Sequence, residues 1–203
     1  MSDLGHIQIE QLNRSTFLAR GMLAAGAAYG ALAVAPFVER VFAQAKVNDI
    51  DILNYALTLE YLEATFYERA LQEVDLSSEA RQLIELVVKH ESDHVDALIS
   101  AVEDQGGTPV PAPGLDFGDS FSTEENFLDL SIIFEDTGVS AYNGAAPLIE
   151  SPEVLASAGT IVQIEARHAA AIRMLVGEDP APASFEEDLP MGQVMKAVTP
   201  FIV

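Results

Sequence analysis

The chain has 203 residues, of which 49% are hydrophobic, so it contains enough apolar material for a folded domain with a sizeable core. It contains no cysteine, which excludes disulfides, thiolate catalysis, iron–sulfur clusters and thiolate zinc sites. The formal net charge of -22 argues against nucleic acid as a partner, because phosphate binding requires lysine and arginine.

Residues 1–45 differ in composition from the rest of the chain. The stretch 21–38, "GMLAAGAAYGALAVAPFV", carries no charge, and it lies between two arginines, Arg14 and Arg20, and the small residues of "VFA" before Gln44. This order is typical of an export signal, and "NRSTFLARG" resembles a twin-arginine signal in which a serine replaces the second arginine. Three interpretations stay open: an export signal, an uncleaved membrane anchor within residues 14–45, and an apolar helix packed on the domain or on a partner. The first two predict a protein of the periplasm or cell envelope.

After residue 46, helical periodicity predicts four helices in chain order. The first covers about 49–74 with Asn48 as its N-cap, and the second begins after the serines at 77 and 78 and ends at the glycines 106 and 107. The loop "GGTPVPAPGLDFGDS" is far too long for a tight helical hairpin. The third helix begins near 122 or 123 and ends before Pro147, and the fourth has Ser151 as its cap and ends at Gly177.

No alternating run rich in valine, isoleucine and threonine predicts a strand, so we expect an all-α fold. Two short connections around one long crossover are typical of a four-helix bundle with metal ligands inside. The expected domains are an N-terminal apolar helix or signal at 1–45, the bundle at 46–178, and a tail at 179–203. We expect this tail to pack on the bundle through a short helix around "MGQVMKAV".

Each predicted helix has a glutamate at the centre of its apolar face, at about 100° per residue. These four glutamates are Glu60, Glu91, Glu135 and Glu165. Two histidines, His94 and His168, follow the second and the fourth glutamate by three residues and lie about 60° away on the same side.

The pattern occurs twice along the chain. Glu135 and Tyr142 lie 75 residues after Glu60 and Tyr67, and Glu165 and His168 lie 74 residues after Glu91 and His94. One Glu-x-x-His motif is a weak signal, whereas two, each preceded at a matching distance by Glu-x6-Tyr, are a strong one.

Four buried carboxylates without partners would each cost several kcal/mol, and they would also repel one another. Two divalent cations would balance the four negative charges, and glutamate oxygens with one imidazole for each metal favour iron or manganese over a structural zinc site. On the helical wheel the nearest cationic side chain, Arg173, lies about 80° from the centre of its face. Protonated or hydrogen-bonded core glutamates without a metal are the alternative.

Four segments, "ALTLEYLEATFY", "KHESDHV", "FEDTGVSAY" and "QIEARHAAAI", resemble the ferritin-like superfamily, in particular its exported, desiccation-related branch, over about residues 48–177. The resemblance implies a ferritin-like four-helix bundle with one long crossover and a centre of two iron or manganese ions. It implies six metal ligands, Glu60, Glu91, His94, Glu135, Glu165 and His168, of which Glu91 and Glu165 would bridge the two ions.

Other polar residues near these positions have more than one interpretation. Glu63 is the rival of Glu60 as a ligand, although it lies about 60° off the apolar centre and the corresponding position, 138, is glycine. Tyr67 and Tyr142 are expected to donate hydrogen bonds to the ligands or to fill the core, with a redox relay as the alternative. His90 is expected on the flank of its helix.

The predicted function is a dinuclear oxidoreductase that reduces peroxide or O2, including ferroxidase or manganese catalase-like activity. Because the chain has no cysteine, we expect an external electron donor, Fe(II) as its own donor, or self-contained peroxide chemistry. Two alternatives stay open. One is metal binding or storage without turnover, for which a closed shell would need extensive contacts in a homo-oligomer. The other is an accessory subunit of a membrane assembly held by residues 14–45.

Overall fold

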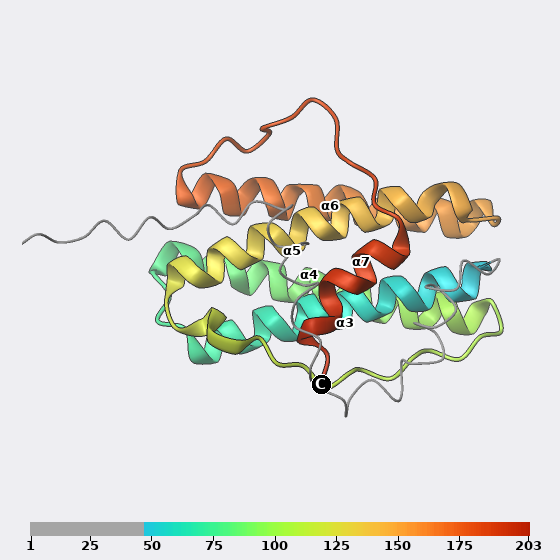
Figure 1. The fold of residues 1–203 in the computed structure, drawn as a ribbon, viewed down its shortest axis with the longest axis horizontal. Helices are drawn as coiled ribbons and strands as arrows, with labels where there is room; N and C mark the ends of the chain where they lie inside the picture. Colours follow the sequence, from blue (N-terminus) through green and yellow to red (C-terminus); the bar gives the residue numbers. More distant parts are fainter. Residues whose placement is uncertain (1–46) are drawn as a thin grey trace, which may run out of the picture.

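The computed structural model describes residues 47–203 and contains, within them, five α-helices, three short 3-10 helices and no strand. The four long helices are α3 (Asp49–Glu73), α4 (Ser78–Asp104), α5 (Glu124–Ala145) and α6 (Pro152–Val176). They lie side by side along the long axis of the molecule (Figure 1). The predicted all-α bundle is therefore confirmed. The predicted N-terminal apolar helix and its three interpretations lie outside the described residues.

The helix ends lie where the sequence predicts them. Asn48 accepts a hydrogen bond from the backbone N–H of Asp51 and forms a capping box with it, and Ser77, Thr123 and Ser151 cap the other three long helices. Gly177 ends α6 in the left-handed conformation with φ of 79°. Local chemistry thus fixes the length of each helix, and with it the position of the glutamates along the bundle.

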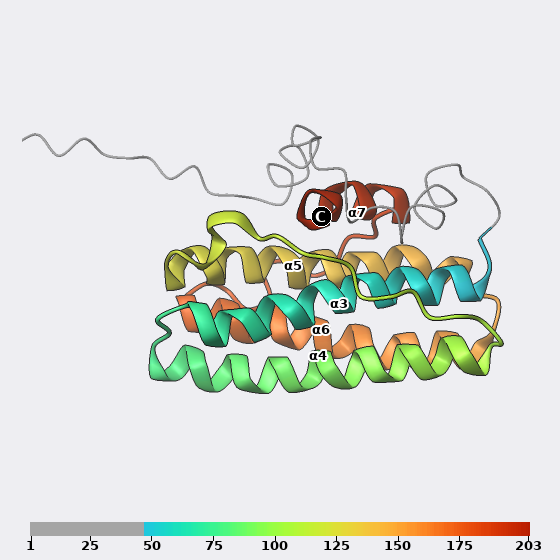
Figure 2. The ribbon, with the colours of Figure 1, turned by 90° about the horizontal axis from the view of Figure 1, so that it is seen from below.

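The connection from α4 to α5 runs along the length of the bundle and includes the 3-10 helix η1 (Gly118–Phe121) (Figure 2). The connections from α3 to α4 and from α5 to α6 are short, and the latter contains η2 (Ala146–Leu148). Helix α3 packs mainly against α4, and α5 mainly against α6. This is the topology with one long crossover that the sequence predicts.

The C-terminal part of the chain covers one side of the bundle. Helix α7 (Met191–Val198) and η3 (Thr199–Phe201) lie over α3 and α5, on the side away from α4 and α6 (Figure 2). The backbone N–H of Leu189 donates to the carbonyl of Ser140, and the Leu189 carbonyl comes so close to Gly144 that a Cβ at that glycine would lie 1.9 Å from its oxygen. Glycine is therefore required where the tail meets α5.

Burial differs between the helices because of this cover. Helix α4 buries a single stripe, consisting of Ala80, Ile84, Val87, Glu91, His94, Leu98 and Val102. Helix α3 buries residues on two faces, because one face lines the bundle interior and the other packs in the same apolar cluster as α7. No helix within residues 47–203 has both the length and the hydrophobicity needed to cross a bilayer.

An aromatic cluster fills the end of the bundle at which α3 ends and α5 begins. The ring of Phe66 lies 4.9–5.3 Å, centre to centre, from five other rings, those of Tyr67, Phe117, Phe121, Phe127 and Phe134. Two of these rings, Phe117 and Phe121, belong to the crossover, so the cluster also attaches the crossover to the bundle.

Replacing Phe66 by alanine should lower the free energy of unfolding by about 3–5 kcal/mol, because Phe66 is fully buried and the cavity cannot close around several rigid rings. Denaturant unfolding measures the change. Phe185→Ala is the matched control, since Phe185 is 91% exposed and its replacement should change the free energy by less than about 0.5 kcal/mol. Equal effects of the two substitutions would contradict the aromatic cluster as a source of stability.

Candidate metal centre

A polar centre lies in the middle of the bundle, between two apolar clusters. One cluster contains Phe66 and its aromatic neighbours, and the other contains Leu53, Leu98 and Ile161 at the opposite end. Each long helix contributes a glutamate with 0% exposure to the centre: Glu60, Glu91, Glu135 and Glu165. The 3.6-residue period that makes each helix amphipathic places these carboxylates inward together with the core side chains.

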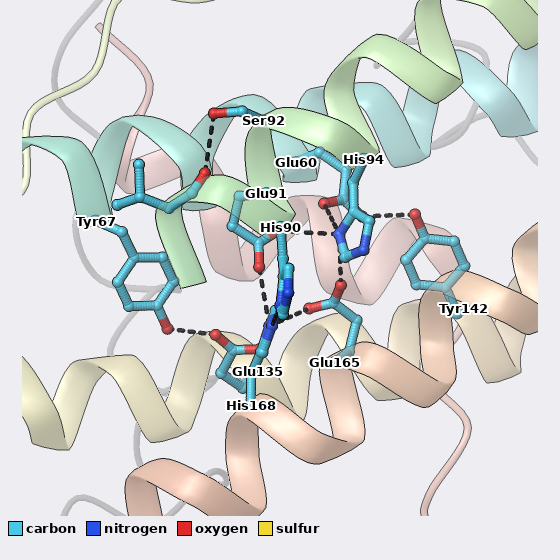
Figure 3. Close-up of polar contacts among 11 residues, drawn as sticks. Glu60, Tyr67, His90, Glu91, Ser92, His94, Glu135, Tyr142, Glu165 and His168 are labelled. Atoms are coloured by element: carbon cyan, nitrogen blue, oxygen red, sulfur yellow. Dashed lines mark hydrogen bonds and ion pairs between the residues drawn. The ribbon is translucent and has the colours of Figure 1, made fainter. Parts of the chain in front are cut away.

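Two groups of four side chains could each hold a metal ion. The first group consists of Glu60, Glu91, His94 and Glu165, and the second consists of Glu91, Glu135, Glu165 and His168 (Figure 3). Within each group the candidate ligand atoms lie within 4.8 Å of one another. Glu91 and Glu165 belong to both groups, which is the arrangement that a bridging role requires.

The imidazoles face the carboxylates through Nδ1. His94 Nδ1 lies 3.2, 3.3 and 3.0 Å from oxygens of Glu60, Glu91 and Glu165, respectively. His168 Nδ1 lies 2.9 Å from Glu91 Oε1 and 3.4 Å from Glu135 Oε2. One N–H group can donate a well-aligned hydrogen bond to one oxygen only. Two ligand atoms that each lie about 2.1 Å from the same ion, with a right angle at the ion, are about 3 Å from each other. These distances therefore fit ligands around an ion.

Several of these atoms lack a hydrogen bond of acceptable geometry within the described part of the chain. They are Glu91 Oε1, Glu135 Oε2, both carboxylate oxygens of Glu165, and His168 Nδ1. These four oxygens each lie within 4 Å of His94 Nδ1 or His168 Nδ1 but are poorly aligned for hydrogen bonding. Buried polar groups without partners are rare and costly, and a pair of cations would satisfy this donor set.

Two tyrosines hold the outer oxygens of the terminal glutamates. Tyr142 on α5 donates a hydrogen bond of 2.6 Å to Glu60 Oε1 on α3, and Tyr67 on α3 donates one of 2.5 Å to Glu135 Oε1 on α5. Burial, and then the neighbouring carboxylates, raise the pKa of both phenols well above 10, so both remain protonated donors. The second oxygen of each glutamate, Oε2, is left to face a histidine.

Burial dominates the protonation of the carboxylates. It raises the pKa of Glu60, Glu135 and Glu165, and for Glu60 and Glu165 neighbouring carboxylates add to the effect. Glu91 is the exception, because contacts with His168 and His94 outweigh its burial and lower its pKa to about 2. In turn, contacts with carboxylates outweigh the burial of the imidazoles and raise the pKa of His94 to about 12 and that of His168 to about 10. Without metal, protons on the glutamates and histidines therefore balance the negative charge that cations would otherwise balance.

Glu63 is a fifth buried carboxylate, 3% exposed, and lies outside both groups of candidate ligands. Burial first, and then Glu165 and Glu135, raise the pKa of Glu63 well above 4.5, so the protonated form is favoured. A Cβ on Gly138 would lie 3.2 Å from Glu63 Oε1, so the glycine at the position corresponding to Glu63 leaves room for that side chain. The geometry groups Glu60, and not its rival Glu63, with the histidine.

Two residues make contacts that the helical wheels do not show. His90, expected on the flank of its helix, stacks on His168 with ring centres 5.2 Å apart, and its Nδ1 lies 2.9 Å from His168 Nε2. Arg173 pairs with Asp136 instead of with the buried carboxylates. A wheel gives directions within one helix, and the contact between His90 and His168 depends on how α4 and α6 pack.

Comparison with known proteins agrees with this architecture. A family model described as a ferritin-like domain matches residues 48–178. The chain is 24% identical over 155 residues to protein rds1 of Schizosaccharomyces pombe, an alignment that covers 76% of this chain. It spans 36% of the length of rds1, so the longer protein has regions with no counterpart in the alignment.

The ligand set can be tested by metal content. Glu91→Gln should lose at least one of two bound metal ions, because Glu91 belongs to both groups, whereas Glu63→Gln should retain both ions. Elemental analysis of purified protein measures the stoichiometry. Glu85→Gln, an exposed site on the same helix, is the control. Loss of metal in Glu63→Gln together with retention in Glu60→Gln would reverse the assignment.

Metal binding should stabilise the protein more at pH 8 than at pH 5. Raised folded-state pKa values of Glu60, Glu135 and Glu165 mean that the metal-free fold gains stability from bound protons at low pH and loses it as pH rises through those values. The contributions of His94 and His168 are full below about pH 6.5 and decline as pH rises from there toward about 12 and about 10, respectively, so they add to the loss of metal-free stability between about pH 6.5 and 8. The contribution of Glu91 is lost only as pH falls from about 4.5 toward about 2, so it stays nearly constant over this range. Metal must also displace protons from both imidazoles, which favours binding at higher pH.

Thermal melts of metal-free and metal-loaded protein across this pH range measure the effect. The difference in Tm should widen steadily as pH rises. Identical melting of the two forms at every pH would show that the buried glutamates do not form a metal site.

Proposed function

Because the chain belongs to the ferritin-like family, we propose that its buried centre binds two iron or manganese ions and uses them to reduce peroxide or O2. The observation that carries the proposal is the sharing of Glu91 and Glu165 between two sets of ligand atoms. Carboxylates shared in this way would hold two ions close enough to act as a pair on one substrate.

When bound, such a pair would supply the two electrons with which a peroxide ROOH, taking up two protons, becomes ROH and water, and two equivalents of an external one-electron donor such as Fe(II) would return those electrons. A second molecule of hydrogen peroxide, oxidised to O2, can replace that donor. The 203 residues contain no cysteine, so they hold no thiolate-bound redox centre.

The chain itself contributes orientation and a dry environment. Tyr142 and Tyr67 fix the outer oxygens of Glu60 and Glu135, so that the inner oxygens point toward His94 and His168. The apolar clusters on either side of the centre keep bulk water away, which strengthens electrostatic interactions inside it. Nδ1 of His90 shares a hydrogen bond with Nε2 of His168, so the other ring nitrogen of His168, Nδ1, can face the carboxylates.

Turnover should depend on the tyrosine hydrogen bonds. Protein loaded with Fe(II) or Mn(II) should consume peroxide, and Tyr142→Phe should lower the rate or the metal affinity by about 10- to 100-fold, because Glu60 loses the group that orients it. Tyr55→Phe is a matched control, since the buried Tyr55 hydroxyl has no hydrogen-bond partner within the described residues. The assays follow peroxide loss, O2 evolution and Fe(II) oxidation.

Two ions bound per chain without any of these activities would refute turnover and favour metal binding or storage instead. An equal effect of Tyr55→Phe and Tyr142→Phe would show that the hydrogen bond to Glu60 has no specific role.

A further inference from the structure

A cavity of about 80 Å³ lies in the bundle beside the candidate metal centre, at the end opposite the aromatic cluster. Its inner wall consists of side chains of all four long helices, among them Leu53, Leu98, Tyr142 and Ile161. Among residues 47–203 no charged side chain lines it, and its surface is almost entirely apolar. An apolar cavity of this kind stays dry and can bind small apolar molecules.

The cavity shares a wall with the centre. The ring of Tyr142 lines the cavity, while its hydroxyl donates to Glu60 Oε1 at 2.6 Å. Leu98 of the cavity lies one turn beyond His94 on α4, and Ile161 lies one turn before Glu165 on α6. A molecule in the cavity therefore lies next to the Glu60 and His94 side of the centre.

The cavity reaches the surface between α4 and α6. Ala97 of α4 and Ser157 of α6 line it and are both exposed, and next to them lie two further small, half-buried residues, Ala101 and Ala158. Small side chains leave space between α4 and α6, which are in less extensive contact than the α3–α4 and α5–α6 pairs. Helices α4 and α6 lie on the side of the bundle away from α7 (Figure 2).

The apolar lining of the cavity favours the binding of an apolar group. Water or hydrogen peroxide would leave hydrogen bonds unmade in such a cavity, which is unfavourable, whereas an alkyl group loses none. At about 80 Å³ the cavity is roughly half the size of an apolar cavity of about 150 Å³ that holds benzene, so it has room for a group of a few carbon atoms. The opening lets a larger substrate extend toward solvent.

We propose that this cavity binds the alkyl group of an organic hydroperoxide and places its peroxide oxygens beside Tyr142 and Glu60. The inference rests on the proposed peroxide reduction and names its substrate class. Burial of each methylene group increases binding roughly fourfold, so the enzyme should prefer a short alkyl hydroperoxide to hydrogen peroxide.

The apolar site is tested first without turnover, on the full chain. Crystals pressurised with xenon should show a xenon atom in the cavity, and Ala158→Leu should abolish it, because the larger side chain fills the space. Ala97→Leu, which closes the opening, is a second variant with the same expected result. Ala156→Leu is the control, since Ala156 is exposed on the same helix and does not line the cavity, and it should retain xenon. Absence of xenon from the unsubstituted protein would overturn the inference.

The substrate is tested with metal-loaded protein, an external reductant, and either tert-butyl hydroperoxide or hydrogen peroxide. Ala158→Leu should lower kcat/KM for the alkyl hydroperoxide on the order of tenfold or more relative to kcat/KM for hydrogen peroxide, while Ala156→Leu, outside the cavity, leaves the ratio of the two unchanged. Equal losses with both peroxides would overturn the alkyl assignment. If the unsubstituted protein consumes neither peroxide, the proposed function fails together with the peroxide assignment. The xenon experiment then decides separately whether the apolar site exists.

Discussion

The burial of five glutamates in one bundle is the constraint on which the rest of the structure depends. Each buried charge without a partner costs several kcal/mol, and the two imidazoles at the centre contact the ligand carboxylates as their basic partners. In the absence of cations the centre must hold protons, as the raised pKa values of Glu60, Glu63 and Glu165 indicate. Proton binding and metal binding therefore compete for the same atoms, and the stability of the fold is coupled to both.

The internal repeat becomes an approximate twofold relation in space, in which Tyr67 and Tyr142 hold each other's partner glutamates across α3 and α5. The relation is broken at two places. The counterpart of Glu63 is Gly138, whose missing side chain makes room for the Glu63 carboxylate. The counterpart of His90, 74 residues later, is Ile164, so His168 has an imidazole partner for which the repeat offers no equivalent beside His94. The two candidate metal positions therefore differ in what supports their histidine.

Much of this could be predicted from the sequence, because helix caps and the 3.6-residue period are local properties. The ends of α3 and α6 followed from Asn48, Ser151 and Gly177, and the wheels identified the buried glutamates one helix at a time. Contacts between helices could not be predicted in this way. The stacking of His90 on His168 depends on the packing of α4 against α6, and the double burial of α3 depends on the tail that covers it. Glu63 was visible as a rival ligand, but its separation from the ligand groups required the geometry.

The two ends of the bundle are packed differently, so the two sides of the candidate centre have different surroundings. Beyond Tyr67 and Glu135, large rings around Phe66 fill the space completely, and the crossover closes over them. Beyond Tyr142 and Glu60, alanines in place of large side chains leave a cavity that opens between α4 and α6. A substrate that enters from this opening meets Tyr142, Glu60 and His94 first, while the side of His168 is held by His90 and backed by the aromatic cluster. The Glu60 side of the candidate centre therefore faces the opening, and its Glu135 side faces the aromatic cluster.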